Sequence, residues 1–115
     1  MLNVIIEDSV SLKIDNFLES YSNIFLNRFS DTGIFDEEKI RNNFILSVKN
    51  IRNNIFSEIE KEFVQEEIYG YKPLEKSKYQ YYIAIEKPKY SLKIEYSEDL
   101  KNKIRFIEKI EFNKR

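Results

Sequence analysis

The chain has 115 residues, 42% of them hydrophobic and 15% aromatic, which predicts one globular domain spanning residues 1–115. It has no cysteine and no histidine, which excludes disulfides, thiolate nucleophiles, imidazole bases and the usual zinc ligands. The net charge is −1, but residues 1–70 carry 7 Lys and Arg against 13 Asp and Glu, whereas residues 71–115 carry 12 against 7, so the C-terminal part is basic.

The N-terminal segment "LNVIIE", residues 2–7, is a short apolar run that predicts a buried strand. Asp8 and Ser9 follow it, and both residue types often cap the N-terminus of a helix. The segment lacks the positive charge of a signal peptide, and the chain has no apolar stretch long enough to span a membrane. We therefore expect a cytoplasmic protein that does not contact a membrane.

A first helix is predicted from Val10 to near Phe29, because apolar residues recur there at spacings of three and four. Its apolar face comprises Val10, Ile14, Phe17, Leu18, Tyr21 and Phe25. The segment "SDTGIF", residues 30–35, has a turn composition and ends the helix. Gly33 and Gly70 are isolated, so there is no glycine-rich phosphate loop, and we expect no cofactor.

The second helix has the most regular pattern. Asp36 is a suitable N-cap, and Glu37 and Glu38 place negative charge where the helix dipole favours it. The apolar stripe comprises Ile40, Phe44, Val48, Ile51, Ile55, Ile59 and Phe63, with Ile45 and Phe56 beside it. The glutamates near its C-terminus lack the regular spacing of a calcium-binding loop, so they predict a solvated helix surface and no metal site.

The C-terminal part of the chain predicts three strands, because apolar residues alternate with polar ones. The first has Tyr79, Tyr81, Ile83 and Ile85 on its core face, and Pro88 interrupts the pattern after it. The second has Tyr90, Leu92, Ile94 and Tyr96 on its core face. In the third, Ile104, Phe106, Ile110 and Phe112 share the core parity, with Arg105, Lys109 and Glu111 on the opposite face.

Short connections between these strands favour an antiparallel meander. The predicted fold class is therefore α+β with the element order β-α-α-β-β-β, in which a helical hairpin packs on one face of a small, mainly antiparallel, twisted sheet.

This order of elements resembles the RelE/ParE-like toxins of bacterial type II toxin–antitoxin systems. The features that carry the resemblance are the opening strand "VIIEDSV", the helix pair, the "KYQYYIAIE" strand, the "YSLKIEY" strand and a short final strand that ends in basic residues. It covers nearly the whole chain. The resemblance implies a compact microbial RNase-like fold and a cognate antitoxin protein as the partner.

One branch of that family cleaves ribosome-bound mRNA without a metal, by attack of a ribose 2′-hydroxyl on the adjacent phosphate. Lys and Arg supply the electrostatic stabilisation for such a step, and Tyr or Lys can move protons. The positions expected to serve catalysis are Lys76, Lys78, Tyr82 and Arg115. The positions expected to bind RNA or another target are Tyr69, Tyr71, Lys72, Lys93, Arg105, Lys109 and Lys114.

The chain also departs from the nuclease branch. Ser91 stands where that branch has an arginine at the start of the third strand, and the tyrosine that often follows the final basic residue is absent. The alternative is a non-enzymatic interaction protein, either a gyrase-binding toxin of the ParE type or a phage-type inhibitor or adaptor. Tyr82 has the parity of an exposed position, whereas Tyr79, Tyr81, Tyr90 and Tyr96 have the parity of core positions.

Overall fold

The computed structural model describes the backbone of residues 1–30, 37–86 and 88–115, and the side chains of residues 1–23, 44–86 and 88–115. Several expectations therefore lie outside the described residues. They are the turn at "SDTGIF", the N-cap at Asp36 and the burial of Phe25 and Ile40.

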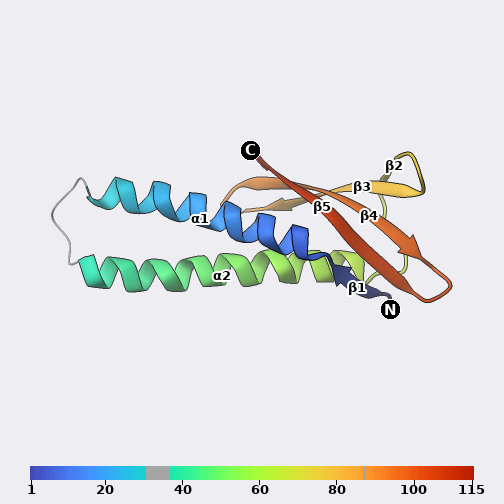
Figure 1. The fold of residues 1–115 in the computed structure, drawn as a ribbon, viewed down its shortest axis with the longest axis horizontal. Coiled ribbons are helices and arrows are strands. Elements are labelled where there is room, and N and C mark those ends of the chain that lie inside the picture. The colour runs from blue at the N-terminus through green and yellow to red at the C-terminus, as the bar shows by residue number, and fades with distance from the viewer. Residues whose placement is uncertain (31–36, 87) are drawn as a thin grey trace.

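The fold is α+β, with two helices and one five-stranded sheet, as expected (Figure 1). The elements are β1 (Asn3–Ile6), α1 (Asp8–Ser30), α2 (Glu37–Phe63), β2 (Lys72–Pro73), β3 (Lys78–Ile85), β4 (Tyr90–Asp99) and β5 (Ile104–Lys114). The one addition to the predicted order is β2, a two-residue strand that pairs with the start of β3.

The strands lie in the order β1-β5-β4-β3-β2. Every neighbouring pair is antiparallel except β1 and β5, which are parallel, so the expectation of a mainly antiparallel sheet is confirmed. The prediction that the first strand is buried was wrong. β1 lies at an edge of the sheet, where Val4 and Ile6 pack against the core while Ile5 remains 45% exposed.

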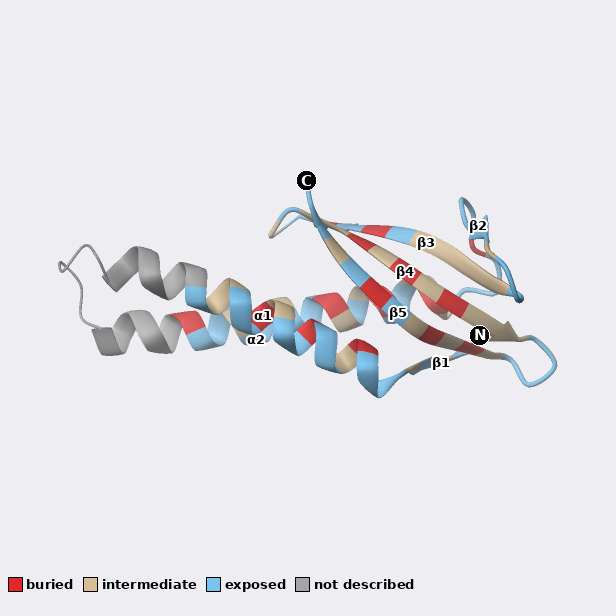
Figure 2. Ribbon diagram, turned by 45° about the horizontal axis from the view of Figure 1, so that its top comes forward, coloured by how far each residue is buried: buried red, intermediate tan, exposed pale blue. Residues whose placement is uncertain are grey.

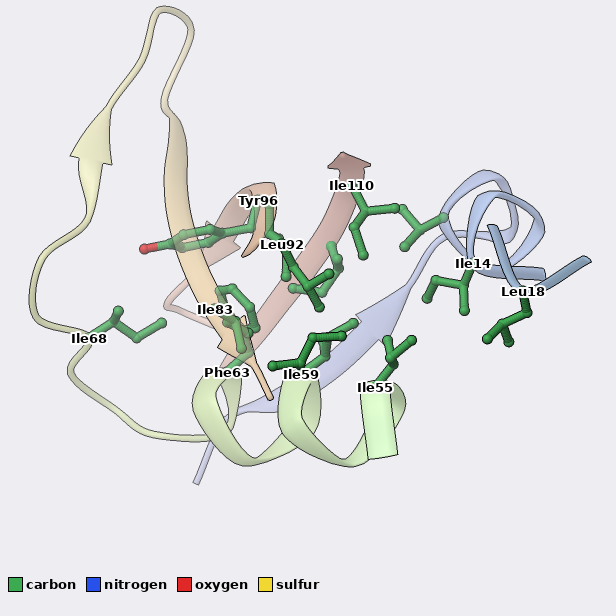
Figure 3. Packing of buried hydrophobic residues seen from close by; sticks show 14 residues of the cluster. Ile14, Leu18, Ile55, Ile59, Phe63, Ile68, Ile83, Leu92, Tyr96 and Ile110 are labelled. Atoms are coloured by element: carbon green, nitrogen blue, oxygen red, sulfur yellow. The ribbon is translucent and has the colours of Figure 1, made fainter. Parts of the chain in front are cut away.

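The two helices cover the same face of the sheet and form one core with it (Figure 3). Val10, Ile14 and Leu18 of α1 meet Ile55, Ile59 and Phe63 of α2, as the helical spacing predicts. The buried residues of the sheet are Ile83, Ile85, Leu92, Ile94, Tyr96, Ile107 and Ile110. Ile45 was expected to widen the stripe of α2, but it is 58% exposed.

The molecule is elongated, with principal extents of 57 × 22 × 22 Å. Its radius of gyration is 16.8 Å, whereas a compact domain of this length has about 13 Å. Figure 1 shows the cause, since the helical hairpin runs well beyond one end of the sheet. The opposite end carries the β2–β3 and β4–β5 turns.

A β-bulge in the β4–β5 pair reverses part of the face pattern predicted for β5. Tyr96 pairs with Ile107 while Glu95 pairs with Lys109, so Glu108 is the extra residue. Before the bulge the core face of β5 therefore holds Arg105 and Ile107, at 2% and 0% exposure. The prediction that Ile104 and Phe106 occupy the core face was wrong. They lie on the opposite face, whereas beyond the bulge Ile110 and Phe112 pack on the core side and Lys109 and Glu111 lie outside, as predicted.

Candidate functional site

The sheet face turned away from the helices is here called the outer face (Figure 2). The alternation of side chains and their burial place on it Asn3, Ile5, Lys78, Gln80, Tyr82, Ala84, Ser91, Lys93, Glu95, Ser97, Ile104, Phe106, Glu108, Lys109, Glu111 and Asn113. No described helix or strand covers this face, so it is one of the surfaces on which a binding site could be built.

The lysines of the outer face are matched by glutamates. Lys93 pairs with Glu111 at 3.7 Å, and Lys109 with Glu95 at 3.8 Å. Lys78 lies 3.4 Å from Glu108, the extra residue of the bulge. Three positive and three negative charges therefore alternate across β3, β4 and β5. Such a ladder favours sheet pairing, but it leaves no net positive field to attract a polyanion.

The residues expected to serve catalysis do not meet at one point. Lys76 lies in the β2–β3 turn, Lys78 begins β3 and Tyr82 lies in its middle. Arg115 is held at the far end of β3, where its Nη2 donates to the Ile85 carbonyl at 2.8 Å and contacts Glu86 at 3.1 Å. The seven residue steps from Lys78 to Ile85 correspond to about 23 Å of strand. One phosphate group cannot contact both ends.

Tyr82 and Ser91 lie in the middle part of the outer face. Tyr82 is 54% exposed, as its parity predicted, and its hydroxyl accepts a hydrogen bond from Gln80 Nε2 at 3.0 Å. Ser91 lies between Ala84 and Asn113 in the strand register. The two residues paired with Ser91 are therefore uncharged, and the nearest lysine along β4 on this face, Lys93, is paired with Glu111.

Four lysines without an ion pair to a described residue lie at the turn end of the sheet. Within the described parts of the chain, Lys72, Lys76, Lys101 and Lys103 form no ion pair, and all are exposed. Lys76 and Lys103 also have positive φ values of 60° and 55°. Left-handed backbone is uncommon in residues other than glycine, asparagine and aspartate. The turn end is thus more basic and more strained than the outer face. Lys114, at the other end of β5, is exposed as well.

The tyrosines beside Gly70 have different environments. Tyr71 packs its ring edge against Tyr79, with 5.4 Å between ring centroids, and Tyr79 lies 5.4 Å from Tyr96. Tyr71 therefore covers the edge of the core. Tyr69 points outward at 81% exposure and donates a 2.8 Å hydrogen bond to Glu67. That hydrogen bond, with the negative charge of Glu67, raises the pKa of Tyr69.

Arg105, expected to contact a target, is instead built into the core. Its guanidinium donates to the carbonyl of Phe63, the last residue of α2, at 2.8 Å, and to those of Gln65 and Glu66 just beyond it, at 3.3 Å for Glu66. It also pairs with Glu98 at 3.0 Å. The carbonyl of Val64, directly after α2, accepts from the Leu2 amide at 3.0 Å.

The last carbonyls of a helix have no partner within the helix, so Arg105 and the N-terminal segment together cap α2. The sequence contains one indication that this part of β5 turns Arg105 toward the core. Ile107 is apolar although it has the parity predicted for the outer face, and an apolar residue out of phase indicates a bulge.

The phenol of Tyr96 is expected to ionise at a higher pH than an ordinary tyrosine. Burial, followed by the charge of Glu98, raises its pKa from 10.0 to about 12. Between those two pH values the unfolded chain loses this proton while the folded protein retains it, so the free energy of unfolding falls as pH rises. Tyrosinate absorbance should show a phase near pH 12 that disappears in Tyr96→Phe and persists in Tyr82→Phe. A wild-type titration that is complete near pH 10 would contradict this prediction.

The described residues contain no group of three Asp or Glu side chains positioned to hold a metal ion. No helix in the described part of the chain is long and apolar enough to cross a membrane. No protein-family model matches the chain, and neither the curated proteins nor the solved structures include a significant match. The site is therefore interpreted from its own geometry.

Proposed function

We propose that this protein is a non-enzymatic interaction protein, which acts by binding another macromolecule. The observation that carries the proposal is the separation of Lys78 and Arg115 along β3, by about 23 Å of strand. Catalysis of phosphoryl transfer requires a base, an acid and cations within hydrogen-bonding reach of one reacting group. The paired lysines of the outer face also suit a protein partner better than a nucleic acid.

The partners that the RelE/ParE-like resemblance implies fit within this proposal as predictions. They are a cognate antitoxin protein, which would control the chain, and DNA gyrase, which would be its target. A phage-type inhibitor or adaptor would act in the same non-enzymatic manner. All three interactions require only a complementary surface and no reacting group.

The second candidate is a metal-independent endoribonuclease that acts on mRNA at the ribosome. It is favoured by the turn end of the sheet, where Lys72 and Lys76 are exposed and unpaired among the described residues. Lys78 lies beside them, although it is paired with Glu108. In this candidate the turn end would bind the RNA backbone, and affinity would fall steeply as the salt concentration rises.

Induced expression in a bacterial host separates the two candidates. We expect mRNA 5′ ends mapped after induction to show no new cleavage sites, and any growth arrest to be unchanged in Lys76→Ala/Lys78→Ala/Tyr82→Phe. A matched variant on the helices, Lys13→Ala/Lys49→Ala/Tyr21→Phe, controls for general loss of charge. Cleavage by the wild type that the first variant abolishes and the control retains would replace the binding proposal with the nuclease.

A further inference from the structure

The edge of β3 is open along most of its length. β2 pairs only with Tyr79 and Gln80, and no other described strand lies on that side of β3. Figure 2 shows β3 as the outermost strand of the sheet except at the end where β2 runs beside it. From Tyr81 to Ile85 this edge therefore has no partner strand among the described residues.

The register identifies the backbone groups that face the open edge. The Leu74 amide donates to the Lys78 carbonyl at 2.7 Å, so Lys78 directs its backbone groups toward β2. In an antiparallel sheet these directions alternate along the strand, and the β3–β4 register is uninterrupted. Tyr82 and Ala84 therefore direct their N–H and C=O groups outward, while Tyr81 and Ile83 bond to β4.

This edge lacks the usual protection against pairing. Natural edge strands carry lysine, proline, inward-facing charge or a bulge. The segment "YYIAI", residues 81–85, has none of these and consists mainly of residues that favour strands. Among the described residues, such protection lies at the β2 end of this edge, at Lys72 and Pro73 of β2 and at Lys78. An unprotected edge of this kind is a template for an added strand.

The space beside the edge is acidic. A hollow of about 320 Å³ lies between α2 and the end of β3, lined by Asn54, Glu58, Ala84, Ile85 and Glu86. Glu62, one helical turn beyond Glu58, accepts a 3.3 Å hydrogen bond from the hydroxyl of Tyr81. Glu58 lines the hollow beside the end of β3, and Glu62 contacts Tyr81 of β3, so both carboxylates lie on the helix side of the path that an added strand would take.

We propose that an extended, basic segment of a protein partner adds to β3 between Tyr81 and Ile85. Its backbone pairs with Tyr82 and Ala84, and its Lys or Arg side chains on the helix side meet Glu58 and Glu62. Glu86, which lines the hollow, already accepts a hydrogen bond from Arg115 at 3.1 Å, so Glu58 and Glu62 are the carboxylates left for a basic partner. This inference names the kind of partner and so rests on the proposed function.

A second copy of the chain is a poorer occupant of this edge. Pairing two β3 edges about a two-fold axis would place the Glu58 and Glu62 side chains of both copies on the same side of the joined sheet. Like charges at such an interface disfavour association. A basic partner gains from the same carboxylates, and this difference in charge decides between the two occupants.

Amide hydrogen exchange measured residue by residue tests the proposal. In the free protein we expect Tyr82 and Ala84 to exchange faster than Tyr81 and Ile83. A blocked synthetic peptide of alternating valine and lysine should slow exchange at Tyr82 and Ala84 by about tenfold or more at saturation. The same peptide with glutamate in place of lysine should leave both amides unprotected.

Charge reversal on α2 provides the matched variants. Glu58→Lys/Glu62→Lys should weaken binding of the lysine peptide by about tenfold, whereas Glu60→Lys, on the exposed side of α2, should change it less than about twofold. Equal protection by both peptides, protection by neither, or protection that grows with protein concentration alone would overturn the proposal. RNA cleavage with peptide binding intact would overturn only the proposed function.

Discussion

Replacement of Arg105 by methionine is expected to lower the free energy of unfolding by about 3–5 kcal/mol, the range for breaking a buried charged network by removing one partner. Arg105 is 2% exposed, and its guanidinium serves three carbonyls at the end of α2. Methionine fills much of the same volume but donates no hydrogen bond. It therefore leaves the buried carbonyl of Phe63, the part-buried carbonyls of Gln65 and Glu66, and Glu98 without their donor. Denaturant unfolding followed by circular dichroism measures the change.

Two further variants isolate the cause. Lys109→Met removes a cation from an exposed position of the same strand and should change the free energy of unfolding by less than about 1 kcal/mol. Arg105→Lys retains the charge but loses the planar, branched set of donors, so it should remain strongly destabilised. A fully stable Arg105→Lys would mean that charge alone, and not the hydrogen bonds to the helix end, accounts for the effect.

The bulge in β5 predicts a second large loss of stability, for a substitution at Ile107. Ile107→Ala should lower the free energy of unfolding by about 2–5 kcal/mol, because it removes buried methyl groups and leaves a cavity. Ile107 is 0% exposed and lies opposite Tyr96 in the core. Phe106→Ala, which removes a larger side chain from the outer face, should cost less than Ile107→Ala.

The same pair of variants tests the strand register directly. Simple alternation through β5 places Phe106 inside and Ile107 outside, and it predicts the reverse order of the two effects. Denaturation midpoints and slopes measured together would show whether the change lies in the folded state. A greater loss for Phe106→Ala would contradict the bulge between the pairs Tyr96–Ile107 and Glu95–Lys109.

Parts of the candidate site followed from local pattern. The exposure of Tyr82 was predicted from its parity in β3, and the basic character of the β2–β3 turn from the lysines around it. The ion pairs of Lys78, Lys93 and Lys109 were not predicted. Each joins side chains on different strands, so it depends on a register that the sequence does not state.

The sequence by itself determined the helices, the three long strands and most of the core, because each depends on a local period of 3.6 or 2 residues. The spacing of Ile55, Ile59 and Phe63 suffices to put them on one face. Tertiary structure decided where the bulge lies, and it alone decided the capping of α2 by Arg105 and the open edge of β3. These features arise where segments far apart in the chain meet, and a one-residue shift in pairing exchanges the two faces of a strand. The resemblance to RelE/ParE-like toxins stays a prediction for the same reason, since it rests on element order and strand composition.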